Sequence, residues 1–224
     1  MKIQTRQIKT TKTKKMKNNS LEIRNISTEI RAVNVESRKI SGLAIPVESR
    51  SELLNGVFYE TISRDAVTED LINSMDVKLY VNHDPSQGTF ARSKHGKGSL
   101  RLFITERGLE FETELPKTAF GDMIMEGILR GDFDAMSFAF VPDLEDWSEN
   151  EDGTYERTIR SIALLEECSI LSCAPAYSAT EVNTRSLENF KEQKKQEQEI
   201  RKQTILSKMD AKLQEIEEAT KNII

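Results

Sequence analysis

The sequence has few cysteines and no long hydrophobic run, and these two absences exclude several classes of protein. Its two cysteines, Cys168 and Cys173, lie in one short segment of a 224-residue chain, which is not the pattern of a disulfide-stabilised secreted protein. No stretch approaches the roughly 18 to 20 consecutive apolar residues of a membrane-spanning helix. The basic N-terminus also lacks the apolar stretch of a secretory signal. We therefore expect a protein that is made and kept in a reducing cytoplasm.

Histidine is equally scarce, and the common metal-binding and phosphate-binding motifs are absent. The two histidines, His83 and His95, are far in sequence from both cysteines, so no zinc-ligand spacing occurs. Neither a glycine-rich phosphate loop followed by Lys-Ser/Thr nor the nucleophile pattern Gly-x-Ser-x-Gly is present. The sequence accordingly predicts no cofactor and no metal.

Charge is unevenly distributed along the chain and divides it into three regions. The formal net charge is -5, with 31% charged and 37% hydrophobic residues, which is typical of a domain with a modest core. Residues 1–18 contain Lys and Arg but no acid. We predict a flexible basic tail over residues 1–19, a folded domain over 20–184 and a charged helical tail over 185–224. The basic tail is either a solvated segment or a contact for nucleic acid or an acidic surface. Since few aromatic residues lie near it, nucleic-acid binding ranks last.

Strands dominate the predicted domain. Alternating apolar residues bounded by turn signals predict strands over residues 21–37, 38–46, 77–88 (running into a turn), 98–116 (a hairpin), 134–142, 155–165 and 166–175. Two helices are expected, one over 63–75 with Ser63 or Thr68 as its cap, and one over 117–132 ending at Gly131. An acidic loop is expected over 147–153. This order predicts an α+β, mostly β fold with a closed or nearly closed β-structure.

The C-terminal region has no glycine or proline and is rich in Lys, Glu and Gln. Apolar or small residues recur at alternating steps of three and four, which predicts a short coiled-coil seam of two heptads. Its positions are Leu206, Met209, Leu213, Ile216, Thr220 and Ile223. The preceding KEQKKQEQE has no apolar stripe and is a solvated helix or a linker. The helix either packs on its own domain or pairs with another chain.

One serine interrupts an otherwise apolar strand. In residues 134–142, DAMSFAFVP, strand alternation places Met136, Phe138 and Phe140 on one face and Ser137 on the other. Ser137 is therefore either a small filler that hydrogen-bonds to backbone or a nucleophile held on a rigid strand.

A histidine and a carboxylate also occupy notable strand positions. His83 follows an alternating strand just before DPSQG, where a side chain can face a cleft or serve a structural role. His95 lies among lysines and glycines and is expected to be exposed. In LLEECSILSCAPA, alternation places Glu167 on the face of Leu165 and Ser169. A buried carboxylate needs a partner, and a histidine and an arginine both remain open.

Cys168 is the other candidate nucleophile. Its neighbours on the strand are apolar, and burial among apolar groups makes a thiol inert. We therefore do not expect Cys168 to act in catalysis.

Four motifs in the same order resemble the prohead (head maturation) proteases of tailed bacteriophages. They are VNHD, GLEFETELPKT, GDFDAMSFAF and LLEECSILSCAPAYSATEV, with FYETISRDAV before them, and the resemblance covers about residues 25–184. It implies His83 as general base, Ser137 as nucleophile and Glu167 as the third catalytic member. Glu167 is preferred to Glu166 because it aligns with the family's glutamate. Two departures are Ala139, where glycine is common, and Cys168, where valine is common.

The resemblance also implies a fold and a biological role. The family resembles the herpesvirus assembly proteases, whose orthogonally packed β-barrel is surrounded by helices. It implies a serine endopeptidase that cuts the major capsid protein precursor or its scaffolding segment, and itself, through an acyl-enzyme. We expect it to be a homo-oligomer inside the assembling procapsid in the host cytoplasm, with no membrane partner. The alternative is a non-catalytic scaffolding or capsid-binding module that uses the C-terminal helix.

Overall fold

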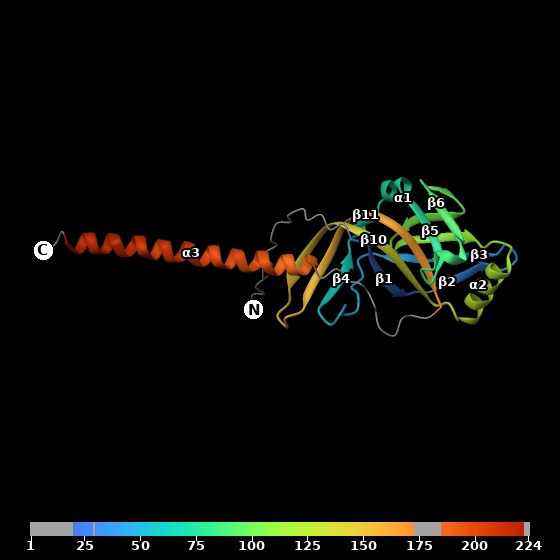
Figure 1. The fold of residues 1–224 in the computed structure, drawn as a ribbon, viewed down its shortest axis with the longest axis horizontal. Helices are drawn as coiled ribbons and strands as arrows, with labels where there is room; N and C mark the ends of the chain where they lie inside the picture. Colours follow the sequence, from blue (N-terminus) through green and yellow to red (C-terminus); the bar gives the residue numbers. More distant parts are fainter. Residues whose placement is uncertain (1–19, 29, 173–184, 222–224) are drawn as a thin grey trace, which may run out of the picture. The chain divides into compact units, whose positions relative to one another are not determined.

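The structure is a computed structural model that describes residues 20–28, 30–172 and 185–221 (Figure 1). It divides into two compact units, residues 1–182 and 183–224. The predicted basic tail, residues 1–19, lies outside the described residues. Within the described ranges, no helix has the length and apolar character needed to cross a membrane.

Two β-sheets make up most of the first unit. The larger sheet has seven strands: β1 (Glu22–Ser27), β10 (Ala135–Glu149), β11 (Tyr155–Leu171), β5 (Asp76–Val81), β6 (Ala91–Lys94) and β7 (Lys97–Gly98) in that order, with β4 (Phe58–Ile62) also paired to β11. The smaller sheet has the order β2 (Ile30–Asn34), β3 (Lys39–Pro46), β9 (Gly108–Glu114) and β8 (Leu100–Thr105). The predicted α+β, mostly β class is confirmed. The pairings among the described strands close neither sheet into a ring, so the orthogonally packed barrel stays a prediction.

The long pair β10 and β11 forms the centre of the larger sheet (Figure 1). β11 is one strand of 17 residues, so the prediction of separate strands over 155–165 and 166–175 is wrong. β10 continues to Glu149, and residues 147–149 are therefore strand and not the predicted acidic loop. The two errors have one cause, because β10 and β11 pair along their whole lengths and this ladder keeps even polar segments extended.

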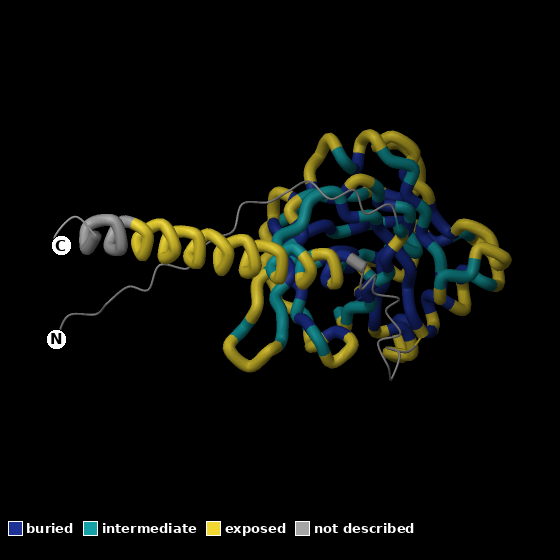
Figure 2. Tube along the Cα trace, turned by 60° about the vertical axis from the view of Figure 1, so that its left-hand side comes forward, coloured by how far each residue is buried: buried dark blue, intermediate teal, exposed yellow. Residues whose placement is uncertain are grey.

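β11 also joins strands from two distant parts of the chain. Its first residues, 155–159, pair in parallel with β4, and residues 167–170 pair in parallel with β5. The core lies on one face of this sheet, where Met136, Phe138 and Phe140 are buried as predicted. Figure 2 shows buried stretches running along the strands of this unit while the turns between them are exposed.

The helices begin and end where short polar residues and glycine permit. α1 (Glu69–Ser74) is capped by Thr68, whose hydroxyl accepts a hydrogen bond from the backbone N–H of Leu71. Ser63, the other predicted cap, instead precedes a short 3₁₀ helix, η1 (Arg64–Ala66). α2 (Ala119–Arg130) begins after Thr118 and ends at Gly131, which has a left-handed conformation that glycine adopts readily. A second 3₁₀ helix, η2 (Pro85–Gln87), follows β5.

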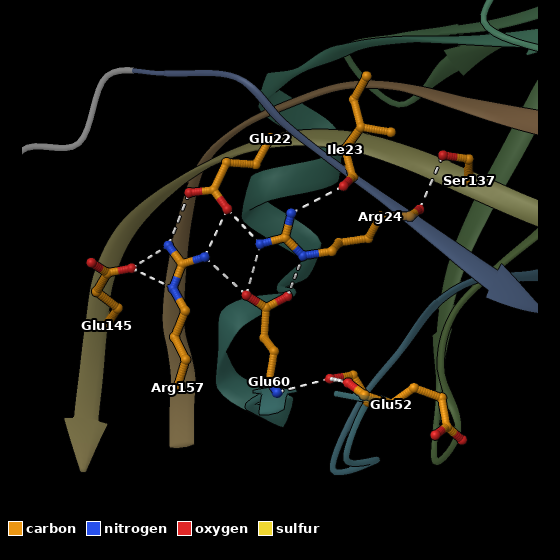
Figure 3. Close-up of polar contacts among 9 residues, drawn as sticks. Glu22, Ile23, Arg24, Glu52, Glu60, Ser137, Glu145 and Arg157 are labelled. Atoms are coloured by element: carbon orange, nitrogen blue, oxygen red, sulfur yellow. Dashed lines mark hydrogen bonds and ion pairs between the residues drawn. The ribbon is translucent and has the colours of Figure 1, made fainter. Parts of the chain in front are cut away.

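A buried ion network joins four strands of the larger sheet (Figure 3). Arg157 on β11 donates to both carboxylate oxygens of Glu22 on β1, at 2.7 and 2.9 Å, and to Glu60 on β4 at 2.9 Å. It also donates to Glu145 on β10 at 2.7 Å. Arg24 on β1 binds both oxygens of Glu60, at 2.7 and 2.9 Å. All five side chains are at least nine-tenths buried.

The arginines stabilise the ionised form of the carboxyl group between them. Burial by itself would raise the pKa of Glu60, but the charges and hydrogen bonds of Arg24 and Arg157 outweigh it and hold this pKa below its ordinary value of 4.5. Buried charges are tolerated only with such partners. The network therefore specifies which strands meet at this end of the sheet.

The second unit contains α3 (Arg185–Lys221), a continuous helix of 37 residues. The segment KEQKKQEQE is therefore helical and not a linker. Leu206, Met209 and Leu213 of the predicted seam are exposed. Pairing of this helix with another chain stays a prediction.

Removing the central guanidinium should destabilise the domain strongly. We expect Arg157→Met to lower the free energy of unfolding by about 3 to 5 kcal/mol, because buried carboxylates lose their partner. Arg160→Met is the matched control on the same strand, since Arg160 is 49% exposed and pairs with Asp146. The control should cost about 1 kcal/mol or less. Urea unfolding followed by circular dichroism measures both, and equal stabilities of the two variants would contradict a structural role for the network.

Acid should also weaken the domain through this network. Because the pKa of Glu60 is lowered in the folded state, its contribution to stability is fully present above about pH 4.5. It is lost as the pH falls through the folded-state pKa. Urea titrations at a series of pH values should therefore give a free energy of unfolding that declines below about pH 4.5. A stability that stays level or rises over that range would be inconsistent with an ionised Glu60.

Candidate active site

His83 lies in a tight turn at the end of β5. Asn82 and His83 both have positive φ, 52° and 58°, and the backbone N–H of Asp84 donates to the carbonyl of Val81 at 3.0 Å. Two central residues with positive φ are the mark of a type I′ turn. Asparagine and histidine are among the residues with a side chain that adopt this conformation most often, so the turn suits both positions.

Asn82 attaches this turn to the end of β11. Its side-chain amide donates to the Ser172 hydroxyl at 3.1 Å, and its side-chain oxygen accepts from the Ser172 backbone N–H at 3.0 Å. The Asn82 backbone N–H donates to the carbonyl of Ile170 at 2.9 Å. The position of His83 is therefore fixed relative to β11 from both the backbone and the side chain.

The His83 ring meets the carboxylate of Glu167 on β11. Nδ1 of His83 and Oε1 of Glu167 form a short hydrogen bond. Since a carboxylate only accepts, Nδ1 carries the proton and the neutral ring keeps its lone pair on Nε2. Nε2 is buried and has no hydrogen-bond partner among the described residues. The ring is thus oriented and polarised by Glu167, with its basic nitrogen unoccupied.

A β-bulge brings Glu167 to this face of the sheet. Ala139 pairs with Glu167 and Phe140 pairs with Leu165, so Glu166 is the extra residue between them. Leu165 consequently lies in the core while Glu167 does not, and the predicted shared face of these two residues is wrong. Glu166 instead binds Lys78 Nζ at 2.7 Å.

Ser137 lies on β10, across β11 from the strand that leads to His83. Its Cα partner on β11 is Ser169, whose own partner on β5 is Tyr80. Ser137 is fully buried, on the strand face opposite that of the core residues Met136 and Phe138. Its hydroxyl donates to the backbone carbonyl of Arg24 at 3.0 Å (Figure 3). The structure thus joins His83 and Glu167 directly and places Ser137 on the strand beyond them, with its proton directed at β1.

The remaining candidates of the sequence do not belong to this group. Burial raises the pKa of the Cys168 thiol far above its ordinary value, in keeping with an inert core residue. His95 is exposed, as predicted, and its ring bonds to the carbonyl of Ser74 at 2.9 Å. Cys173 lies outside the described residues.

Sequence reasoning missed several residues that hold this site together. Ser169 was placed on the face of Glu167 by alternation, but nothing in the pattern indicated that its hydroxyl would bond to Glu167. Asn82 was visible in VNHD, where an asparagine before a histidine at a strand end is itself a turn signal. The contact of Arg24 with Ser137 carries no local signal, since it joins residues 113 positions apart.

Comparisons with known proteins bear on this arrangement. No curated protein and no solved structure matches the chain. The model of one protein family, described as Caudovirus prohead serine protease, matches residues 25–193. This range contains β1 from Asn25 onward and every residue of the His83, Ser137 and Glu167 group. The chain belongs to the caudovirus prohead serine protease family.

Proposed function

We propose that this protein is a prohead maturation endopeptidase in which Ser137 is the nucleophile, His83 the general base and Glu167 the residue that orients and stabilises the imidazole. The observation that carries the proposal is the contact of His83 Nδ1 with Glu167, together with a buried Nε2 that has no partner within residues 20–28, 30–172 and 185–221. Membership of a serine protease family supports it. Ser137, which is fully buried and pairs with Ser169 on β11, provides the nucleophile.

The proposed reaction assigns one proton-transfer step to each of these groups. Nε2 of His83 takes the proton of Ser137 as Oγ attacks the peptide carbonyl, and Glu167 stabilises the imidazolium that forms. The imidazolium then gives this proton to the leaving amine, so the peptide C–N bond breaks and an acyl-enzyme remains. Water, activated by the same nitrogen, hydrolyses the ester and restores Ser137.

Two features must change before attack in this scheme. The Ser137 hydroxyl must turn from the Arg24 carbonyl, 3.0 Å away, toward His83. Since Ser137 has no exposed surface, chain around it must also move to admit a substrate carbonyl. The resting conformation must therefore open before Ser137 can react with a substrate or a probe.

We further propose the substrates and the setting. The enzyme cuts the major capsid protein precursor or its scaffolding segment inside the procapsid, where it acts as a homo-oligomer. Residues 185–224, and residues 1–19, carry it into the shell and are then removed by self-cleavage. Two facts support this part of the proposal: the composition of these tails differs from that of the domain, and charged tails are accessible to proteolysis. The orthogonally packed barrel of the herpesvirus assembly proteases is the proposed form of the complete domain.

The Ser137→Ala and His83→Ala variants test the nucleophile and base. A fluorophosphonate probe reports the nucleophile without knowledge of the cleavage site, because the serine oxygen displaces fluoride and the adduct is seen by intact mass. We expect no adduct for Ser137→Ala and a rate lowered by roughly 10²- to 10⁴-fold for His83→Ala. Cleavage of the capsid precursor and loss of the tails should stop in parallel. Wild-type labelling and cleavage by either variant would end the catalytic assignment.

Glu167→Gln tests the third member against a neighbour in the same bulge. The amide keeps the size of the side chain but has no negative charge with which to stabilise the imidazolium. Labelling should therefore slow by on the order of 10²-fold or more. Glu166→Gln is the matched control, because Glu166 bonds to Lys78 and not to His83. It should label at nearly the wild-type rate. If the two variants lost equal activity, Glu167 would have no special part in the reaction.

The alternative function is a non-catalytic scaffolding or capsid-binding module. The exposed apolar residues of α3, Leu206, Met209 and Leu213, favour contact with another helix. This alternative requires that capsid maturation proceed normally with Ser137→Ala and fail when α3 is deleted.

A further inference from the structure

We propose that Ser169 is a positioning residue that holds His83 and Glu167 in their relative orientation, an inference that rests on the proposed proteolytic function. Ser169 has no exposed surface. It lies on β11 between its Cα partners Tyr80 on β5 and Ser137 on β10. It therefore occupies the strand that separates the proposed base from the proposed nucleophile.

The Ser169 hydroxyl contacts both members of the His83–Glu167 pair. It donates its proton to Oε2 of Glu167 at 2.8 Å, and it accepts the backbone N–H of His83 at 3.2 Å. A serine hydroxyl has one donor and two acceptor sites, so this group matches one need of each partner. An alkyl side chain of the same size could make neither of these hydrogen bonds.

The first of these bonds fixes the carboxylate. Oε1 of Glu167 is engaged by His83 and Oε2 by Ser169. With both oxygens engaged, the carboxylate plane cannot rotate without losing a hydrogen bond in a site where its side chain is only 9% exposed. A fixed carboxylate sets the direction of Nδ1 and, through the rigid ring, that of Nε2.

The second bond holds the backbone of the base. His83 has a φ of 58°, in the left-handed region that only a small share of residues with a side chain adopt, histidine among them. The bond from its backbone N–H to Ser169 attaches this conformation to β11. Ser169 therefore couples the turn to the carboxylate, and loss of the hydroxyl removes one hydrogen bond from each.

Kinetics with the fluorophosphonate probe separate positioning from binding. We expect Ser169→Ala to lower the maximal labelling rate of Ser137 by about 10- to 100-fold, the effect of a misplacement near 1 Å, with an unchanged half-saturating probe concentration. Ser169→Cys keeps the size of the side chain but donates only weakly, and it should show a similar loss without opening a cavity. Ser161→Ala is the control, since Ser161 lies on the same strand and bonds to Asp143.

Proton NMR tests the same inference without catalysis. In a Ser137→Ala background, the His83 Nδ1 proton in its short bond to Glu167 should give a strongly downfield resonance. Adding Ser169→Ala or Ser169→Cys should shift or broaden it, while adding Ser161→Ala should not. If Ser137→Ala itself proved to label and cut normally, the proposed function would fail while this resonance still tested the contact.

The two measurements decide the matter in either direction. A reduced maximal rate with a displaced resonance supports Ser169 as a positioning residue. A wild-type rate in Ser169→Cys, or an unaltered resonance in both Ser169 variants, overturns the proposal. Thermal unfolding of each variant shows whether a lost rate reflects a lost fold.

Discussion

The buried ion network around Arg157 is the constraint on which the arrangement of the larger sheet depends. Arg157 has no exposed surface and binds carboxylates from β1, β4 and β10, so a shift of any of these strands would leave a buried charge without a partner. Removal of one partner from a buried ion pair costs much more free energy of folding than the intact pair contributes. The network therefore acts mainly by excluding other strand arrangements. One member of it, Arg24, also supplies the carbonyl that accepts from Ser137, which brings the ion network into direct contact with the proposed nucleophile.

β11 carries two kinds of charge, and they serve different ends. Near its start, Arg157 is fully enclosed by carboxylates and has no capacity for proton transfer. Near its end, Glu167 bonds to the His83 ring, whose far nitrogen has no hydrogen-bond partner among the residues that the structure describes. A stable sheet needs every buried charge to have a partner of opposite charge. Proton transfer instead needs a group with a lone pair that can accept a proton. The domain places these two environments at opposite ends of one strand, so the proposed site does not draw on the charges that hold the sheet together.

How far the sequence could lead is clear from particular residues. The alternation in DAMSFAFVP correctly put Met136, Phe138 and Phe140 in the core and Ser137 on the opposite face. The same rule failed at Leu165 and Glu167, because it assumes an unbroken period of two and the bulge at Glu166 adds one residue. It also failed at residues 147–149, where pairing with β11 keeps a polar segment extended. The partner of Glu167 was undecided between a histidine and an arginine, since a local pattern shows that a buried carboxylate needs a partner but not which distant residue supplies it.

The sequence by itself determined the mostly β class, the core face of the Ser137 strand, the end of α2 at Gly131 and, through its motifs, the family. These properties depend on side-chain periodicity and on residues adjacent in the chain, which local physical rules describe. Only the tertiary structure decided that His83 meets Glu167, that Ser169 contacts both, and that Ser137 rests on the Arg24 carbonyl. Ser169 and Glu167 are only two positions apart, but the other three contacts join residues separated by 84, 86 and 113 positions. Their geometry follows from strand register, a bulge and a turn with positive φ, and these arise from packing of the whole sheet and not from any single segment.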